Sequence, residues 1–268
     1  MTLPASVVQG LADGSYTVAV SMTDAAGNPA TATQTLTRDA DTLNLPTLTI
    51  GPISDDNFLN QAESLQDLSI GGTSNNLVEG QLVTVTLNNI QYSGTVAADG
   101  SWTVTVPAAD LGNLPDGDQL LVVVSADTSG NPASASTSLV VLASAQAQPT
   151  LTMNVVAGDD VINATEATAD AAVSGSSTLL AAGTLVTVSF NGTDYSTTLD
   201  ADGNWTVNVP SAAFTSVDPG STQIFTVTAT DVAGNPATAT QEVSFITTPP
   251  ALTNITVDAG DTLNLAES

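Results

Sequence analysis

Apolar and polar residues alternate along several short segments of the chain, and this alternation predicts its secondary structure. Residues two positions apart lie on the same face of a strand, so the pattern indicates strands with one buried face. Val and Thr, which favour strands, dominate these segments. Turn dipeptides such as Asp99-Gly100 and Asp202-Gly203 separate them, and no segment has the period of a long amphipathic helix. The predicted strands include LVTVTL (82–87), WTVTVP (102–107), QLLVVVSA (119–126), TLVTVSF (184–190), WTVNVP (205–210) and IFTVTATD (224–231).

The same segments recur along the chain. The motif D-x-x-G-N-P-A begins at Asp24, Asp127 and Asp231, at intervals of 103 and 104 residues. Trp102 and Trp205 are also separated by 103 residues. A period of this length is that of one small domain, so the chain is a tandem array of similar domains.

The position of the landmarks predicts four segments. Residues 1–45 correspond to the C-terminal part of a repeat, residues 46–148 and 149–249 to complete repeats, and residues 250–268 to the start of a further one. About seven short strands in roughly 100 residues predict an all-β fold of tandem immunoglobulin-like β-sandwiches arranged end to end. The two Trp residues alternate in phase with Val, so we predict that they fill the sandwich cores rather than stack on a sugar.

The charge changes the functional picture. The formal net charge is −26, Arg38 is the one basic side chain, and Lys and His are absent. Nucleic acid and anionic membrane surfaces would repel such a chain, which argues against both as partners. Protons, solvent cations or bound metal must neutralise the carboxylates, so we expect multivalent cation binding. The alternative is that the acidity serves only solubility.

Other functions are poorly supported by the composition. Without His, Cys or Lys, the usual bases and nucleophiles are missing, so we expect no enzymatic activity. Cys is absent, so packing or metal must stabilise each repeat. No apolar run approaches the roughly 20 residues of a membrane helix, and the first residues lack the basic start of a secretory signal. We therefore expect any export signal to lie outside this sequence.

A first group of candidate ligands follows the opening strand of each repeat, TLTI (47–50) or TLTM (150–153). Calcium takes about six to eight hard oxygen ligands, which Asp, Asn and Glu supply. Asp and Asn also cap turns, which is the alternative explanation. The third copy keeps the Asn and the Glu three residues later, which favours metal. The candidates are Asp55, Asp56, Asn60 and Glu63, then Asp159, Asp160, Asn163 and Glu166, then Asp261, Asn264 and Glu267.

A second group lies in the D-x-x-G-N loops, where Gly permits a left-handed turn between the last two strands of a repeat. A hairpin connection explains most of this motif, and direct metal ligation by its Asp is the second interpretation. The candidates are Asp24, Asn28, Asp127, Asn131, Asp231 and Asn235.

The connectors between repeats differ in charge. Residues 37–46 contain Asp39 and Asp41, whereas residues 143–149 and 246–250 contain no carboxylate. In an end-to-end array, the loop after the first strand of one repeat is expected to face the D-x-x-G-N loop of the next. Ion binding there would stiffen the joint, with unequal strength at different joints.

The chain resembles the tandem bacterial Ig-like extender repeats of very large, type I-secreted (RTX-type) adhesins. The resemblance rests on the opening P-T-L-T-[IM], the D-D-x-x-N-x-x-E-like loop, the D-G-x-W turn and the closing T-D-x-A-G-N-P-A-T-A-T. It implies a secreted, cell-surface stalk that calcium rigidifies outside the cell and that supports attachment and biofilm formation. The acidic loops would supply the calcium ligands. Neighbouring repeats would be the partners, and a domain elsewhere in the parent protein would bind the distal ligand.

An alternative function is a ligand-binding module for a glycan, a protein or ice. Thr-rich segments such as TATQTLT (31–37) present a regular row of hydroxyls. Alternating Thr is also ordinary on the solvent side of a strand, and few aromatic residues are available for a binding patch. The sequence therefore favours the spacer.

Overall fold

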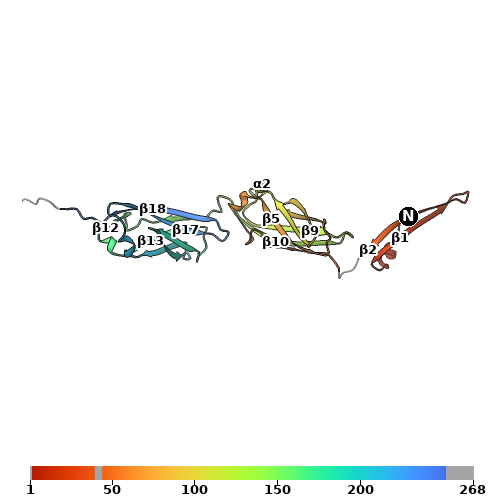
Figure 1. Cartoon of the computed structure of the whole chain (residues 1–268), viewed down its shortest axis with the longest axis horizontal. Helices are drawn as coiled ribbons and strands as arrows, with labels where there is room; N and C mark the ends of the chain where they lie inside the picture. Colours follow the sequence, from red (N-terminus) through yellow and green to blue (C-terminus); the bar gives the residue numbers. More distant parts are fainter. Residues whose placement is uncertain (1, 40–43, 252–268) are drawn as a thin grey trace, which may run out of the picture. The chain divides into compact units, whose positions relative to one another are not determined.

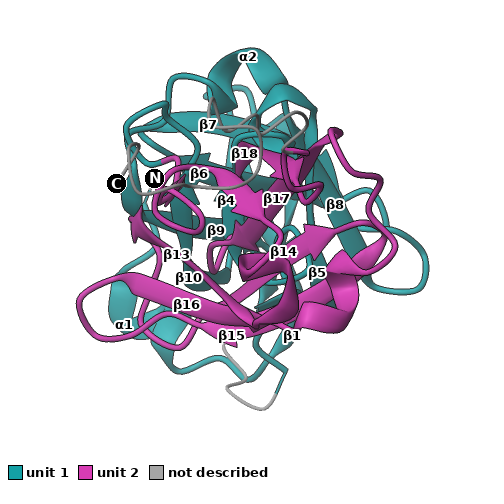
Figure 2. Ribbon diagram, turned by 90° about the vertical axis from the view of Figure 1, so that its left-hand side faces the viewer, with its two compact units in different colours: residues 1–147 teal, residues 148–268 magenta. Residues whose placement is uncertain are grey.

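The computed structural model describes residues 2–39 and 44–251. The chain divides into two compact units, residues 1–147 and 148–268 (Figure 2). Strands make up most of the structure, and helices are few and short (Figure 1). The predicted all-β class is thus confirmed, while the finer division into four segments stays a prediction. Within residues 2–39 and 44–251, no helix is long and apolar enough to cross a membrane.

Unit 1 begins with a short helix and a β-hairpin. Helix α1 (Ala5–Gln9) precedes strands β1 (Gly14–Thr23) and β2 (Pro29–Arg38). The two strands pair antiparallel along their whole length. Asp13 and Arg38 form an ion pair of 2.6 Å at the open end of the hairpin.

The rest of unit 1 is a sandwich of two sheets. Strands β3 (Thr47–Ile50), β5 (Leu68–Asn75) and β8 (Ser101–Val106) form the smaller sheet. The larger sheet has the order β4-β10-β9-β6-β7. Its strands are β4 (Phe58–Asn60), β6 (Leu82–Leu87), β7 (Ile90–Thr95), β9 (Gly117–Ala126) and β10 (Pro132–Leu142), with η1 (Glu63–Leu65) and α2 (Ala108–Leu111) in the connections.

Unit 2 repeats this topology. Its smaller sheet has the order β11-β13-β16 and its larger sheet the order β12-β18-β17-β14-β15. The strands are β11 (Thr150–Met153), β12 (Val161–Asn163), β13 (Ala171–Thr178), β14 (Leu185–Phe190), β15 (Thr193–Thr198), β16 (Asn204–Val209), β17 (Thr222–Thr230) and β18 (Pro236–Ile246). The connections contain η2 (Glu166–Thr168) and η3 (Ser211–Phe214).

Each sandwich contains one strand more than the alternation predicts. The extra strand is β4 in unit 1, which pairs parallel with β10, and β12 in unit 2, which pairs parallel with β18. Each has three residues, too few to show a period. The chain passes from the smaller sheet to the larger one just before this strand. The acidic loop is therefore the crossover between the two sheets.

The cores lie between the sheets, and both Trp residues belong to them. Trp102 and Trp205 are each 2% exposed, which confirms the prediction of a packing role. Their neighbours along the strands, such as Val104 and Val207, are also buried. Unit 2 adds an aromatic cluster in which the rings of Phe190 and Phe225 stack with centroids 4.2 Å apart. The alternating pattern therefore assigned the buried face of these strands correctly.

Candidate functional site

The crossover loop of unit 1 is held by its own polar side chains. The amide of Ile53 donates to Oδ1 of Asn57 over 3.1 Å, and the amide of Phe58 donates to Oδ1 of Asp56 over 2.9 Å. Asp55 and Asn57 have φ of 64° and 67°, in the left-handed region that Asn and Asp tolerate. Ile53 itself is fully buried. The tight turn thus places an apolar side chain in the core and leaves Asp55 and Asp56 exposed.

The crossover loop of unit 2 has the same geometry with different chemistry. The amide of Val156 donates to Oδ1 of Asp160 over 2.8 Å, and the amide of Val161 donates to Oδ1 of Asp159 over 3.1 Å. Asp160 thus takes the place of Asn57. Its second oxygen, Oδ2, accepts a hydrogen bond of 2.8 Å from Nε2 of Gln241 on β18. An amide oxygen in unit 1 and a carboxylate oxygen in unit 2 therefore accept the equivalent backbone hydrogen bond.

The recurring Asn and Glu hydrogen-bond to each other's backbone. In unit 1 the amide of Glu63 donates to Oδ1 of Asn60 over 2.9 Å, and the amide of Asn60 donates to Oε2 of Glu63 over 3.0 Å. In unit 2 both bonds between Asn163 and Glu166 are 3.0 Å. The bonds have the reciprocal pattern of a capping box, here linking the last residue of β4 or β12 to the first residue of η1 or η2. It gives each repeated residue a structural role at the start of η1 and η2.

The D-x-x-G-N loops share one arrangement in all three copies. Oδ1 of Asp24 accepts from the amides of Ala26 and Asn28, each over 2.9 Å, and Oδ2 accepts from Nδ2 of Asn28 over 2.8 Å. Asp127 and Asp231 accept the corresponding bonds from Asn131 and Asn235, over 2.8 to 2.9 Å. The pKa of Asp24 is lowered chiefly by the hydrogen bond from the side chain of Asn28, and the pKa of Asp127 by the one from Asn131. These bonds give the Asp and the Asn of the motif a structural role in the hairpin, and metal ligation by the Asp stays a prediction.

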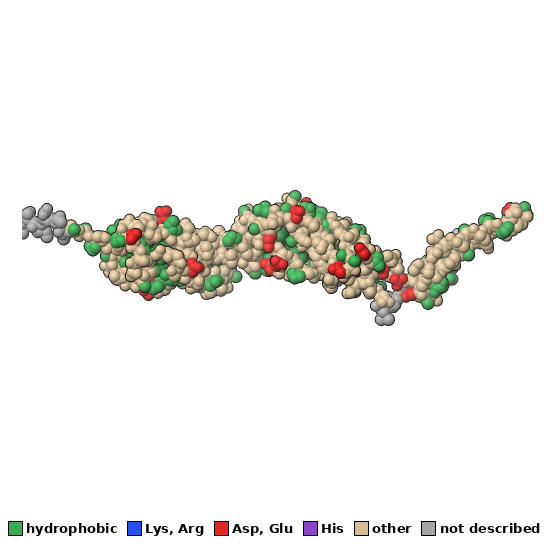
Figure 3. Space-filling view, viewed as in Figure 1, with side chains coloured by type: hydrophobic (Ala, Val, Ile, Leu, Met, Phe, Trp, Pro, Cys, Tyr) green, Lys and Arg blue, Asp and Glu red, His purple; other side chains and the backbone are tan. Residues whose placement is uncertain are grey.

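The described residues do not bring the predicted ligands together as a carboxylate cluster. No group of three or more Asp, Glu, His or Cys side chains able to hold a metal occurs among residues 2–39 and 44–251. On the face shown in Figure 3 the acidic side chains lie in separate small patches. Asp39 is half-buried. Asp41, Asp261, Asn264 and Glu267 lie outside the described residues.

The carboxylate oxygens of the acidic loops could supply some of the ligands of a hard cation such as calcium. Each loop carboxylate that accepts one or two hydrogen bonds keeps lone pairs for further ligation, since an ionised carboxylate has about four acceptor positions. Calcium needs about six to eight oxygens, so backbone carbonyls and amide oxygens would have to complete any site built on Asp56 and Glu63. The assignment of individual ligands stays a prediction.

Sequence reasoning overlooked a further recurring carboxylate. Oδ1 of Asp67 accepts from the amide of Ala108 over 2.9 Å, at the start of α2. The corresponding Asp170 accepts from the amide of Ser211 over 2.9 Å and from Nδ2 of Asn208 over 3.0 Å. These bonds lower the pKa of Asp170, that to Ser211 most strongly. The two Asp residues are 103 positions apart, so the repeat interval was the signal that identifies them.

Comparison with known proteins confirms the resemblance seen in the sequence. Residues 100–257 match the family described as bacterial Ig-like domain (group 3). No curated protein matches the chain.

Several solved structures of adhesins are similar to the chain. A Ca2+-stabilised adhesin that helps an Antarctic bacterium bind ice is 32% identical over 88% of this chain, with a TM-score of 0.47. A 1.5-MDa bacterial ice-binding adhesin, described for its retention at the host cell surface, is 31% identical over 91%, with a TM-score of 0.47. A tetra-tandem repeat from the extending region of a large adhesion protein is 29% identical over 88%, with a TM-score of 0.33. The chain spans 58%, 78% and 57% of these three structures.

Proposed function

Because the chain belongs to the bacterial Ig-like domain family (group 3), we propose that it is an extender segment of a large bacterial cell-surface adhesin. In this role the repeats space a distal adhesive domain from the cell for attachment and biofilm formation. The observation that carries the proposal is the recurrence of one sandwich, with the same strand order and the same polar loops, in a chain that matches this family. A repeated small domain adds length with each copy, which is what a spacer needs.

We further propose that calcium binding by the acidic loops rigidifies the segment. The net charge of −26 and the presence of a single basic side chain support this, because mutual repulsion of carboxylates favours a bound cation. Loop residues such as Asp56 and Glu63 keep acceptor capacity beyond their hydrogen bonds. The proposal assigns no catalytic role, since the chain has no His, Cys or Lys. Cell-surface location and export by type I secretion belong to the same proposal.

Small-angle scattering with calcium and with a chelator tests the rigidification. The particle is expected to be extended and stiff in calcium and to become flexible when calcium is removed. Calorimetric titration with calcium gives the number and strength of sites on the same sample. A scattering profile that does not change on chelation would overturn the calcium mechanism.

A double variant, Asp56→Asn with Glu63→Gln, separates ion binding from loop structure. Oδ1 of Asp56 accepts one bond, from the amide of Phe58, and the side-chain oxygen of Asn can accept the same bond. Gln also completes a capping box. The double variant should therefore keep the stability of unit 1 in chelator and lose calcium affinity. The matched control is Asp99→Asn, because Asp99 accepts bonds from Ser101 in a turn outside the crossover loop.

A further inference from the structure

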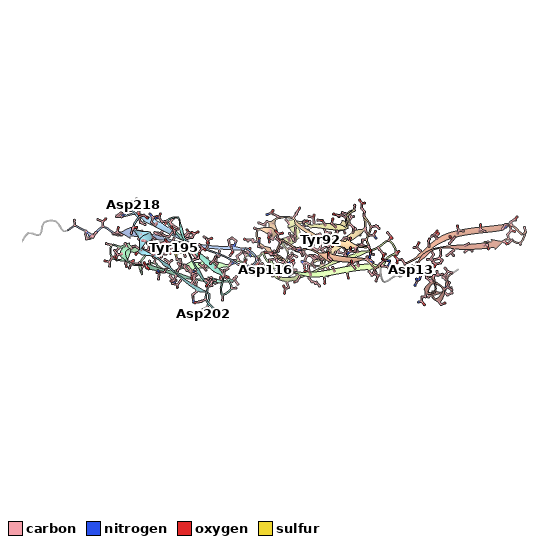
Figure 4. The ribbon with its side chains drawn as sticks, turned by 60° about the horizontal axis from the view of Figure 1, so that its bottom comes forward. Asp13, Tyr92, Asp116, Tyr195, Asp202 and Asp218 are labelled. Atoms are coloured by element: carbon pink, nitrogen blue, oxygen red, sulfur yellow. The ribbon has the colours of Figure 1, made fainter. Side chains whose placement is uncertain are left out.

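The connector that leaves unit 1 is bound to the body of its sandwich. Residues Ala143 and Ser144 follow β10, and Ala143 packs against the core of unit 1. Oδ1 of Asp116, in the loop before β9, accepts from the amide of Ala143 over 3.1 Å and from the amide of Ser144 over 3.0 Å. Oδ2 of Asp116 accepts from the hydroxyl of Ser144. One carboxylate thus holds both connector residues (Figure 4 labels Asp116).

Ser144 also accepts hydrogen bonds from the next residues of the connector. Its Oγ accepts a hydrogen bond of 3.2 Å from the amide of Gln146, and its carbonyl accepts one of 3.1 Å from the amide of Ala147. These two bonds close a turn over residues 144–147. The connector therefore leaves the last strand as a folded turn tied to Asp116.

The carboxylate of Asp116, which we call the anchor, accepts its hydrogen bonds from donors of the protein itself. Burial opposes ionisation of Asp116, but the bonds from Ser144 and Ala143 outweigh it and lower the pKa of the carboxyl. Hydrogen bonds to an ionised acceptor are stronger than neutral ones. Three donors from the connector thus occupy three of the about four acceptor positions of the carboxylate.

The equivalent position is an Asp in the hairpin and a Gly in unit 2. In the hairpin it is Asp13, which pairs with the side chain of Arg38. In unit 2 it is Gly220, whose amide donates to the carbonyl of Phe245 over 2.6 Å. A carboxylate at this position therefore distinguishes unit 1 from unit 2, and the connector of unit 1 is one of the two that contain no carboxylate of their own.

We propose that Asp116 anchors the connector at Ala143 and Ser144 and fixes the path of the chain as it leaves the unit 1 sandwich, without a bound cation. Stiffness at this connector then comes from a hydrogen-bonded carboxylate. This goes beyond the proposed calcium mechanism and does not depend on it.

Amide hydrogen exchange followed by NMR in the presence of chelator tests the anchor. The amides of Ala143 and Ser144 should be protected in the full chain. In Asp116→Asn they should exchange about tenfold faster or more, because the charged acceptor is lost. Ser144→Ala should mainly release the amide of Gln146 and leave the protection of Ala143 partly intact. Asp99→Asn is the matched control, because Asp99 accepts the same pair of bonds, from the amide and hydroxyl of Ser101.

The outcomes separate this inference from the proposed function. Rapid exchange of both amides in the unmodified chain in chelator would overturn the anchor, and so would unchanged protection in Asp116→Asn. Protection that appears only when calcium is added would also overturn it, while supporting the calcium mechanism. A lower thermal midpoint of unit 1 in Asp116→Asn would by itself speed amide exchange. In that case the exchange of Ala143 and Gln146 in Ser144→Ala tests the anchor in a folded sandwich.

Discussion

Asn60 and Glu63 are joined by two reciprocal hydrogen bonds, each from the backbone amide of one residue to the side chain of the other, over 2.9 and 3.0 Å. The same two bonds join Asn163 and Glu166. The spacing that predicts calcium ligands is therefore also the spacing that orders the start of η1 and η2. A mutation at these positions has to be designed so that the two roles are separated.

Asn60→Ala is expected to lower the free energy of unfolding of unit 1 by about 1 kcal/mol, with or without calcium, because the amide of Glu63 loses its acceptor. Chemical denaturation in chelator measures this change. Glu63→Gln is the control, since it keeps the pattern of a capping box and should cost little. Equal losses for the two variants would contradict a capping role.

Gly72→Ala is expected to destabilise unit 1 by about 1 to 3 kcal/mol or more, because the new Cβ overpacks the core. It would lie 1.9 Å from the carbonyl oxygen of Thr49 and 2.6 Å from the Trp102 ring. Gly175→Ala should do the same in unit 2, where the Trp205 ring is 2.7 Å away. Thermal unfolding measures both. Gly112→Ala is the control, since its Cβ would have its nearest contact at 3.7 Å.

The D-x-x-G-N loops of Asp24 and Asp127 should make stability depend on pH in the acid range. The pKa of Asp127 is lowered in the folded state, chiefly by the side chain of Asn131. A depressed folded-state pKa gives stability that is present above the unfolded value of about 3.9 and is lost as the pH falls through the folded value. An NMR titration of the Asp127 carboxyl should show a midpoint below the ordinary value. In Asp127→Asn this contribution should vanish, and a midpoint at or above the ordinary value in the unmodified chain would refute the assignment.

Tyr92 is expected to lose its proton at a higher pH than an ordinary tyrosine. Burial, together with the hydrogen bond to Asp110 and the charge of that residue, raises its pKa from 10.0 to about 12. The hydroxyl donates to Oδ2 of Asp110 over 3.0 Å. Because the folded-state pKa is raised, the contribution to stability is complete below the unfolded value and is lost as the pH rises through about 12.

Phenolate absorbance during alkaline titration checks this expectation. In Asp110→Asn the midpoint of Tyr92 should fall towards the ordinary value without reaching it, because burial remains. Phe substitution at Tyr92 removes the signal and identifies the transition. An Asp110→Asn midpoint equal to that of the unmodified chain would show that the carboxylate has no part in the shift.

Several features of the fold were accessible from the sequence because they depend on local periodicity. Trp102 alternates with Val104 and Val106, and all three are buried, as the period of a strand requires. The turn at Asp99-Gly100 places Gly100 at a φ of 83°, a conformation that Gly adopts without strain. The repeated landmarks also identified the tandem array and its family.

Other features depended on contacts between segments distant in sequence. Strand β4 has three residues and pairs parallel with β10, about 80 positions later, so no local pattern identifies it. Asp116 meets Ser144 only because the strands β9 and β10 bring the two loops together. Neither contact leaves a spacing signal of its own.

The sequence by itself determined which residues face the core, where the chain turns and which oxygen-bearing side chains recur, because each of these follows from neighbours a few positions away. Only the tertiary structure decided which distant groups reach those oxygens. A carboxylate in a sequence is suited both to a cation and to a backbone amide, and the fold brought the amides of Ala143 and Ser144 to Asp116 from a segment 27 and 28 positions away.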